Sequence, residues 1–262
     1  MIRLDKVSVT LGGRQVVSEA SFAAEAGRLT AIIGPNGSGK TTTLRAISGD
    51  RTYSGHIEIE GRDLRSMSAA ELALERGVLQ QSVNLGFPFR VKEILEMGII
   101  AGNAGSAEEA ERIMLAALRA VDLEGFEDRV ATALSGGEQS RMHMARVLCQ
   151  ISTPTYNGKA RWLFLDEPVA ALDVKHQLAI MKVAKSFADQ GGGVLAVMHD
   201  LNLTAMFADH VVMYRQGRIF AAGTPAEVLT PSNLSAVYGC ELEVIRDSDT
   251  GRIRIHPAEL VA

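Results

Sequence analysis

The chain has 262 residues, 47% of them hydrophobic, with a formal net charge of −4 and a pI of about 5.9. This length can bury a large core, as one big α/β domain or two small ones. The acidic balance argues against a basic nucleic-acid-binding surface, and no apolar run approaches the ~18 residues needed to span a bilayer. Cys149 and Cys240 lack metal-ligand spacing, which indicates reduced thiols in a cytosolic protein.

The first fifty residues follow a strand–turn–strand pattern and then a strand–loop–helix pattern. Met1–Leu11 alternates apolar and polar residues like a half-buried strand, lacks the apolar core of a signal peptide, and has its hairpin partner in Val16–Phe22. The apolar strand Leu29–Ile33 runs into a glycine-rich loop, and a helix is predicted over Lys40–Ser48, ended by Gly49. This is the local context that a phosphate-binding loop requires.

The rest of the chain is predicted to be one α/β domain, 1–262, with a mostly helical subdomain inserted at about 86–150. Helix starts are marked by Ser/Thr-x-x-Glu capping boxes at 68–71, 106–109 and 224–227, and Gly77 is expected to stop the first of these helices. Further strands are predicted at 56–60, 162–165, 194–198, 211–214 and 218–221. Residues 151–159 are the most loop-like stretch.

The glycine loop Gly34–Thr41 fits the pattern G-x-x-x-x-G-K-[ST]. Its backbone N–H groups can wrap a β-phosphate, with the positive end of the following helix behind them. Lys40 would bridge the β- and γ-phosphates, and the Thr41 hydroxyl would bind Mg²⁺. A chance match has a frequency on the order of a percent for such a chain, and the flanking strand and helix lower it further.

Two acids, Asp166 and Glu167, end a second buried strand. In a phosphate-loop enzyme the first acid holds the Mg²⁺ shell and the second can polarise the attacking water. On its own, Asp-Glu-Pro is an ordinary turn at the end of a strand. The glycine loop makes the catalytic interpretation the better one.

Four other features would be structural if each stood alone. Leu134–Gln139 places a serine and two glycines before a helix predicted over 139–150, where a cap or an anion site can form. His199 follows a strand and could hydrogen-bond the γ-phosphate. Gln81 lies between the nucleotide motifs, and Ala171-Leu172-Asp173 precedes a helix.

Taken in order, these residues resemble the ATPase subunits of ATP-binding-cassette (ABC) transporters over essentially the whole chain. Gly34–Thr41 matches the Walker A motif, Gln81 the Q-loop, Leu134–Gln139 the signature, Leu163–Glu167 Walker B, Asp173 the D-loop and His199 the switch histidine. The resemblance implies a P-loop (RecA-like) core with an N-terminal antiparallel β-subdomain and an inserted helical subdomain. It also implies ATP and Mg²⁺ as cofactors, and ATP hydrolysis coupled to transport.

The resemblance assigns roles residue by residue. Nucleotide binding falls to Gly34, Pro35, Asn36, Gly37, Ser38, Gly39, Lys40, Thr41, Thr42, Ser135, Gly136, Gly137, Glu138 and Asp173. Catalysis falls to Glu167, His199 and Gln81, and Mg²⁺ binding to Thr41, Gln81 and Asp166. Two positions depart from the family pattern. Leu11 lies where an aromatic residue often stacks on adenine, which leaves base stacking in doubt, and Val169 replaces a usual threonine.

Finer features resemble the importer branch that moves metal chelates, with heme favoured and ferric siderophores or cobalamin as alternatives. They are Leu85–Phe89, His199–Asn202, Gly223–Leu229 with Val237–Gly239, and the extra residues Ile151–Arg161. The resemblance implies a homodimer on two permease subunits at the cytoplasmic face of the bacterial inner membrane. A periplasmic binding protein would act through the permease, without nucleic acid and without direct contact between heme and this chain. A soluble ABC ATPase acting on nucleic acid or ribosomes usually carries two cassettes in one chain or a long coiled coil, together with a basic surface, and this sequence shows neither. A GTPase-like switch would need the N/T-K-x-D motif, which is absent from the sequence.

Overall fold

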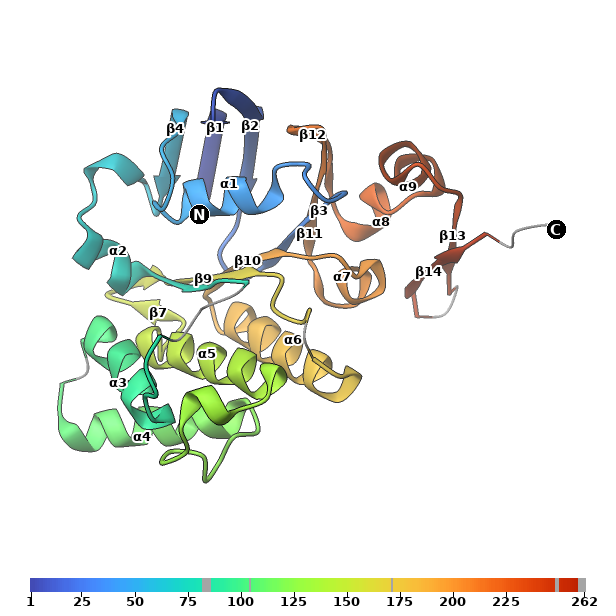
Figure 1. The fold of residues 1–262 in the computed structure, drawn as a ribbon. Helices are drawn as coiled ribbons and strands as arrows, with labels where there is room; N and C mark the ends of the chain where they lie inside the picture. Colours follow the sequence, from blue (N-terminus) through green and yellow to red (C-terminus); the bar gives the residue numbers. More distant parts are fainter. Residues whose placement is uncertain (82–85, 104, 171, 248–249, 259–262) are drawn as a thin grey trace. The chain divides into compact units, whose positions relative to one another are not determined.

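The computed structural model describes residues 1–81, 86–103, 105–170, 172–247 and 250–258. It divides into two compact units. The first, called the outer unit here, contains Met1–Arg65 and Leu195–Ala262; the second, the middle unit, contains Ser66–Val194. Strand β10 (Gly193–Val197) and the 3-10 helix η1 (Leu64–Ser66) each cross a boundary between the units. Figure 1 shows the chain coloured along its sequence.

The outer unit begins with an antiparallel sheet in the order β2-β1-β4-β5. Its strands are β1 (Ile2–Leu11), β2 (Arg14–Ala24), β4 (Ser54–Ile59) and β5 (Arg62–Asp63). Ile2 pairs with Ala24 on one side and with Ile59 on the other, and all three side chains are buried. Alternating burial along β1 and β2 fits a sheet with one face on the core. The predicted N-terminal hairpin is confirmed.

The outer unit also holds a parallel strand pair that leads into the glycine loop. Strand β3 (Leu29–Ile33) is buried at every residue and pairs in parallel with β11 (His210–Arg215), which pairs antiparallel with β12 (Arg218–Gly223). Helix α1 (Lys40–Ile47) follows the loop. The remaining elements are α7 (Leu201–Phe207), α8 (Pro225–Val228), α9 (Pro231–Tyr238) and the hairpin of β13 (Leu242–Arg246) and β14 (Ile253–Pro257).

The middle unit combines a parallel strand pair with five α-helices among its described residues. Strand β6 (Arg76–Leu79) pairs with β9 (Trp162–Asp166), with Val78 opposite Phe164. The helices are α2 (Ala69–Glu75), α3 (Val91–Gly102), α4 (Ala107–Ala120), α5 (Gly136–Gln150) and α6 (Val174–Asp189), with a 3-10 turn η2 at Ala131–Ala133. Helices α3, α4 and α5 pack on one another, in green in Figure 1. The boundaries of the inserted subdomain stay a prediction.

Three local predictions need correction. The stretch at 151–159 contains part of a small hairpin, β7 (Thr155–Tyr156) with β8 (Lys159–Ala160), because Asn157 and Gly158 both adopt positive φ in a tight turn. The carboxylate of Glu109 accepts from Gly105 N, so Ser106 caps α4 without a reciprocal box. The helix predicted from residue 139 begins at Gly136.

Candidate active site

The glycine loop depends on a close backbone approach at its first residue. Gly34 is buried at the end of β3, with a φ of 143°, and an added Cβ would overlap the carbonyl oxygen of Tyr214. Only glycine therefore fits this position without displacing β11. The Tyr214 hydroxyl is hydrogen-bonded to that of Thr43 in α1 at 3.2 Å, and burial raises the tyrosine pKa to about 12. The buried strands thus fix both ends of the loop.

Lys40 is folded back onto the glycine loop. Its Nζ donates to Gly34 O at 2.8 Å and to Pro35 O at 3.0 Å, and the residue is 5% exposed. The Ser38 hydroxyl is also buried and has no hydrogen-bond partner among the described residues. A buried hydroxyl without a partner is costly, and a phosphate oxygen would provide an acceptor. The loop therefore carries a cation and an unsatisfied donor suited to a phosphate.

His199 follows β10 in the same unit as the glycine loop. Met198 N donates to Ile32 O at 3.0 Å, so the chain before His199 lies beside the end of β3 that leads to Gly34. Asp200 caps α7 by accepting from Leu203 N at 2.8 Å, which fixes the backbone just after the histidine. His199 itself is exposed. The two motifs of the outer unit therefore meet at one edge of its strands.

The two acids lie at the end of β9 in the middle unit. Asp166 is 3% exposed, and Glu167 follows with a φ of 53°. A left-handed conformation is unusual for glutamate, and such conformations cluster at functional sites. Gln81 Nε2 donates to Glu167 Oε2 at 2.7 Å, although 86 residues separate them in sequence. The structure thus joins two of the three predicted catalytic residues.

A cavity of about 220 Å³ lies at these residues in the middle unit. Gln81, Asp166 and Glu167 line it on one side, and Gly136 and Gln139 line it from α5. The first turn of the signature helix therefore borders the same space as the predicted catalytic acid of its own chain. A cavity of this volume has room for several ordered waters.

His143 of α5 lines the same cavity, and the sequence analysis did not single it out. It is 6% exposed, and neither ring nitrogen has a hydrogen-bond partner among the described residues. Burial first, and then the charge of Arg146, lower its pKa to about 4, so the imidazole is neutral near pH 7. The spacing of apolar residues along α5 predicts that position 143 is buried, but a sequence pattern cannot show that a cavity lies beside it.

The signature residues form the first turn of α5. The Ser135 hydroxyl accepts from Glu138 N, and the Glu138 carboxylate accepts from both the hydroxyl and the N–H of Ser135. These bonds from Ser135 hold the pKa of Glu138 below its usual range. The Ser-x-x-Glu spacing at 135–138 is itself a capping box, so the sequence contained the signal for the earlier helix start. Gly136 and Gly137 are therefore helical residues.

Asp173 is the N-cap of α6. Its Oδ1 accepts from His176 N at 2.9 Å, and this bond, followed by the contact with the His176 ring, lowers the Asp173 pKa. Ala171 of the predicted 171–173 motif lies outside the described residues, as does Leu85 of the predicted 85–89 segment. Asp173 thus has a structural role as the cap of α6.

The predicted site residues fall into two groups, one in each unit. The outer unit holds Gly34–Thr42 and His199; the middle unit holds Gln81, Ser135–Glu138, Asp166, Glu167 and Asp173. Among the described residues, no three His, Cys, Asp or Glu side chains cluster as a metal site. The buried Asp166 carboxylate offers oxygen donors of the kind that Mg²⁺ uses, together with substrate phosphates, in nucleotide enzymes.

Comparison with known proteins places the chain among relatives of one kind. The family described as "ABC transporter" matches residues 17–170. Hemin import ATP-binding protein HmuV of Rhizobium meliloti (strain 1021) is 56% identical over 245 residues, covering 93% of each chain. The protein of the same name from Rhizobium johnstonii is 52% identical over 93% of this chain and 92% of its own.

Solved structures agree on the fold. A dimeric bacterial ABC transporter cassette superposes with a TM-score of 0.75 at 28% identity, covering 86% of this chain and 99% of its own. The ATP-binding subunit of another ABC transporter gives a TM-score of 0.75 at 22% identity, covering 92% and 95%. The predicted fold class, a P-loop α/β core with an antiparallel β-subdomain and a helical region, is confirmed. The chain belongs to the ABC transporter family and is one of its ATPase subunits.

Proposed function

We propose that this chain hydrolyses ATP to energise heme import across the cytoplasmic membrane of a bacterium. The observation that carries the ATPase role is the 2.7 Å hydrogen bond between Gln81 and Glu167, beside the buried Asp166. The cargo rests on the relatives named for hemin import, which share about half of their residues with this chain. Ferric siderophores and cobalamin are the alternative cargoes.

The glycine loop would hold the ATP phosphates. Backbone N–H groups of the loop, apart from that of Pro35, and the N-terminus of α1 supply donors and positive potential. Lys40, which now donates to two loop carbonyls, would turn its ammonium to the β- and γ-phosphates, and the buried Ser38 hydroxyl would gain an acceptor. Leu11 lies where an aromatic side chain often stacks on adenine, so we expect contacts with the phosphates to contribute most of the affinity for ATP.

Mg²⁺ would be held by the Thr41 hydroxyl, the Gln81 carbonyl and the Asp166 carboxylate, all oxygen ligands of the kind it prefers. When bound, it neutralises charge on the phosphates and orients them. Asp166 ends a fully buried strand, so its carboxylate is rigidly placed. Glu167 would accept the proton of the attacking water, and His199 would donate a hydrogen bond to the γ-phosphate.

The signature residues would act on the ATP held by a second copy of this chain. Ser135, Gly136 and Gly137 begin a 15-residue helix, whose N-terminus favours anions. The Ser135 hydroxyl now donates to Glu138 and would turn to the partner's γ-phosphate. Asp173 would contact the same interface. ATP then favours the closed dimer because it makes contacts that only this state completes.

The permease would bind the middle unit. Exposed apolar side chains gather in and around α3 there: Phe87 is 69% exposed, Phe89 36%, Met97 47% and Ile100 79%. Exposed apolar groups of this kind mark contact surfaces. None of the described helices is long and apolar enough to cross a bilayer. We therefore place the protein at the inner face of the membrane through two permease subunits, with a periplasmic binding protein acting on their far side.

The deciding experiment is uptake by a strain lacking this gene, supplied with heme, a ferric siderophore or cobalamin in turn. Selective loss of heme uptake, restored by the wild-type gene but not by Glu167→Gln, supports the proposal. Glu243→Gln is a matched control, because among the described residues this exposed carboxylate forms its ion pair with the His256 ring, at 3.6 Å in the C-terminal hairpin. Intact heme uptake with loss of another cargo would overturn the choice of heme.

Two biochemical tests address the site itself. Glu167→Gln should bind ATP without turnover and accumulate as a dimer in size-exclusion chromatography. Lys40→Ala should abolish tight ATP binding in titration calorimetry. A Glu167→Gln monomer in saturating ATP contradicts the shared interface, and unchanged affinity of Lys40→Ala removes that lysine from phosphate binding.

A further inference from the structure

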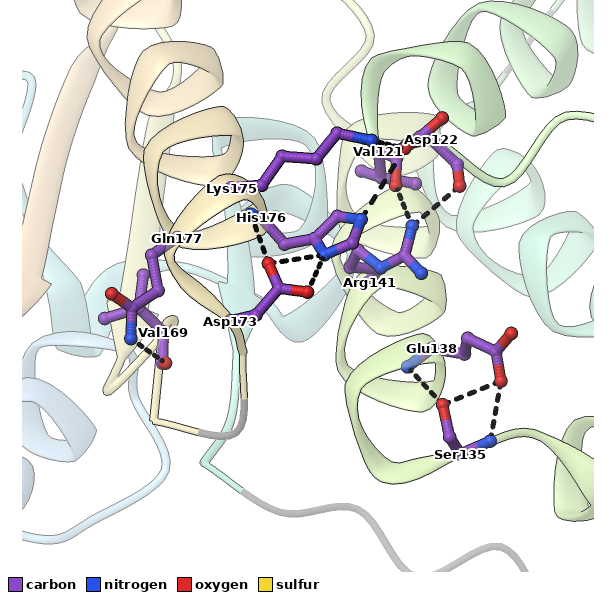
Figure 2. A network of polar contacts seen from close by, with 10 residues as sticks. All are labelled: Val121, Asp122, Ser135, Glu138, Arg141, Val169, Asp173, Lys175, His176 and Gln177. Carbon is purple, nitrogen blue, oxygen red and sulfur yellow. Dashed lines mark hydrogen bonds and ion pairs between the residues drawn. The ribbon is translucent and has the colours of Figure 1, made fainter.

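A histidine at the start of α6 lies between two carboxylates of the middle unit. His176 Nδ1 is 2.9 Å from both oxygens of Asp173, and its Nε2 is 3.5 Å from Asp122 Oδ2 (Figure 2). The side chain is 18% exposed, whereas Asp173 is 66% and Asp122 61% exposed. The ring is thus the shielded centre of an otherwise solvated cluster.

Asp122, just after α4, is anchored to the signature helix. The buried Arg141 of α5 donates through Nη1 to the carbonyl oxygens of Val121, at 2.9 Å, and Asp122, at 2.6 Å. Lys175 Nζ lies 2.7 Å from Asp122 Oδ2 and is the main reason that the Asp122 pKa is lowered. The backbone of Asp122 is therefore bound to α5, and its side chain to α6.

Two groups of polar contacts share helix α5 (Figure 2). The Ser135–Glu138 cap lies at the N-terminus of the helix. Further along the same helix, Arg141 binds the Asp122 backbone, and the Asp122 side chain leads through His176 to Asp173. Ser135 and Asp173 are the residues that the proposed function places against the partner's nucleotide.

We propose that His176 is a positioning residue, whose ring joins Asp173 to Asp122 and so holds Asp173 in register with the signature helix. This inference rests on the proposed function, in which Ser135 and Asp173 of one protomer meet the nucleotide of the other. The bridge fixes the position of Asp173 relative to the helix that begins after Ser135, so both residues keep the same relative placement at the interface.

The two ring nitrogens of His176 face different carboxylates, Nδ1 that of Asp173 and Nε2 that of Asp122. The other charged groups around the ring are Lys175 of the α6 N-terminus and Arg141 from α5. Glutamine at position 176 could not span the same two carboxylates with a rigid ring, so His176→Gln should loosen the link between them.

The test compares ATPase kinetics of the full chain with those of His176→Gln, Asp122→Asn and the double variant. Exposed ion pairs contribute small coupling energies, so we expect kcat to fall about two- to fivefold in each single variant. The KM for ATP should change less than about twofold, because the bridge binds no nucleotide. The double variant should be no slower than the slower single variant.

The split between kcat and KM separates positioning from a merely structural role. A chain with a loosened fold would lose ATP affinity as well, whereas loss of the bridge should lower kcat and leave the KM for ATP nearly unchanged. Lys185→Gln is the matched control, because it removes a 2.7 Å ion pair with Asp189 at the far end of α6. Additive effects, a change in KM as large as the change in kcat, or an equal loss of kcat in the control would overturn the proposal.

Separate measurements distinguish a variant that does not fold from a failure of the proposed catalytic site. Urea unfolding of each variant detects a misfolded chain, and Asp122→Asn tests the same bridge from its other side. Glu167→Gln in the same assay must abolish turnover. Retained turnover in that variant contradicts the proposed catalytic site, whereas lost turnover with additive His176 and Asp122 effects contradicts only the bridge.

Discussion

Replacing His143 with leucine should stabilise the protein, and more so in acid. The wild-type ring is buried without a hydrogen-bond partner among the described residues, and its pKa lies at about 4 against about 6.5 in an unfolded chain. Between these values the unfolded chain binds a proton that the folded chain does not. Stability linked to His143 is therefore complete above pH 6.5 and is lost as pH falls toward 4.

The size of the effect follows from the two pKa values. At pH 5 the unfolded imidazole is almost fully protonated and the folded one is mostly neutral, so the wild type loses about 1–2 kcal/mol relative to pH 7.5. Leucine cannot titrate, so it avoids this loss. It also removes two unsatisfied polar atoms, each of which costs on the order of 1 kcal/mol or more when it finds no water.

The assay is urea unfolding of wild type and His143→Leu at pH 5 and 7.5. The difference between their free energies of unfolding isolates position 143, because all other titrating groups are common to both proteins. We expect that difference to grow by about 1–2 kcal/mol at pH 5. His143→Gln is the matched control, because it abolishes the titration but keeps a buried polar group. A difference that stays constant between the two pH values would refute the neutral, buried imidazole.

Three further substitutions test the packing that supports the site. Gly34→Ala should abolish ATP binding in calorimetry, because its Cβ would overlap the Tyr214 carbonyl oxygen and displace the loop; unchanged affinity contradicts this. Gly98→Ala should lower the free energy of unfolding by about 1–3 kcal/mol, because its Cβ would overlap the Arg146 carbonyl oxygen where α3 crosses α5; an unaltered urea midpoint contradicts this. Thr43→Val should cost about 1–3 kcal/mol by leaving the buried Tyr214 hydroxyl without its hydrogen bond, and full stability would show that water replaces it.

Patterns local in sequence predicted local structure well. The sequence predicts strands at Met1–Leu11 and Leu29–Ile33, and both are present. Successive side chains of a strand point to opposite faces, so alternating residues indicate a strand with one buried face and a continuous apolar run indicates a strand buried on both. The boxes at Ser68 and Thr224 formed because both partners are four residues or fewer apart. The third box failed at Ser106 because Gly105 N offered the Glu109 carboxylate an alternative donor of equal kind.

Contacts between distant segments could not be predicted in this way. The bond from Gln81 to Glu167 requires β6 to lie beside β9, which depends on how the strands pair across the intervening helices. The cavity beside His143 depends on the same arrangement. Motif resemblance named Gln81 and Glu167 as site residues, but no rule of spacing connects residues that far apart. His143 and His176 belong to no motif, so the sequence analysis passed over both.

The Gln81–Glu167 bond also bears on how the site can work. An amide has one nitrogen that donates and one oxygen that accepts. With Nε2 donating to Glu167 at 2.7 Å, the Oε1 atom stays available as an oxygen ligand for Mg²⁺. In the proposed function, one side chain would therefore orient Glu167 as the general base and also hold Mg²⁺, which neither glutamate nor lysine could do at this position. A glutamate would oppose the Glu167 charge, and a lysine has no acceptor. The need for both properties explains why the chemistry favours glutamine here.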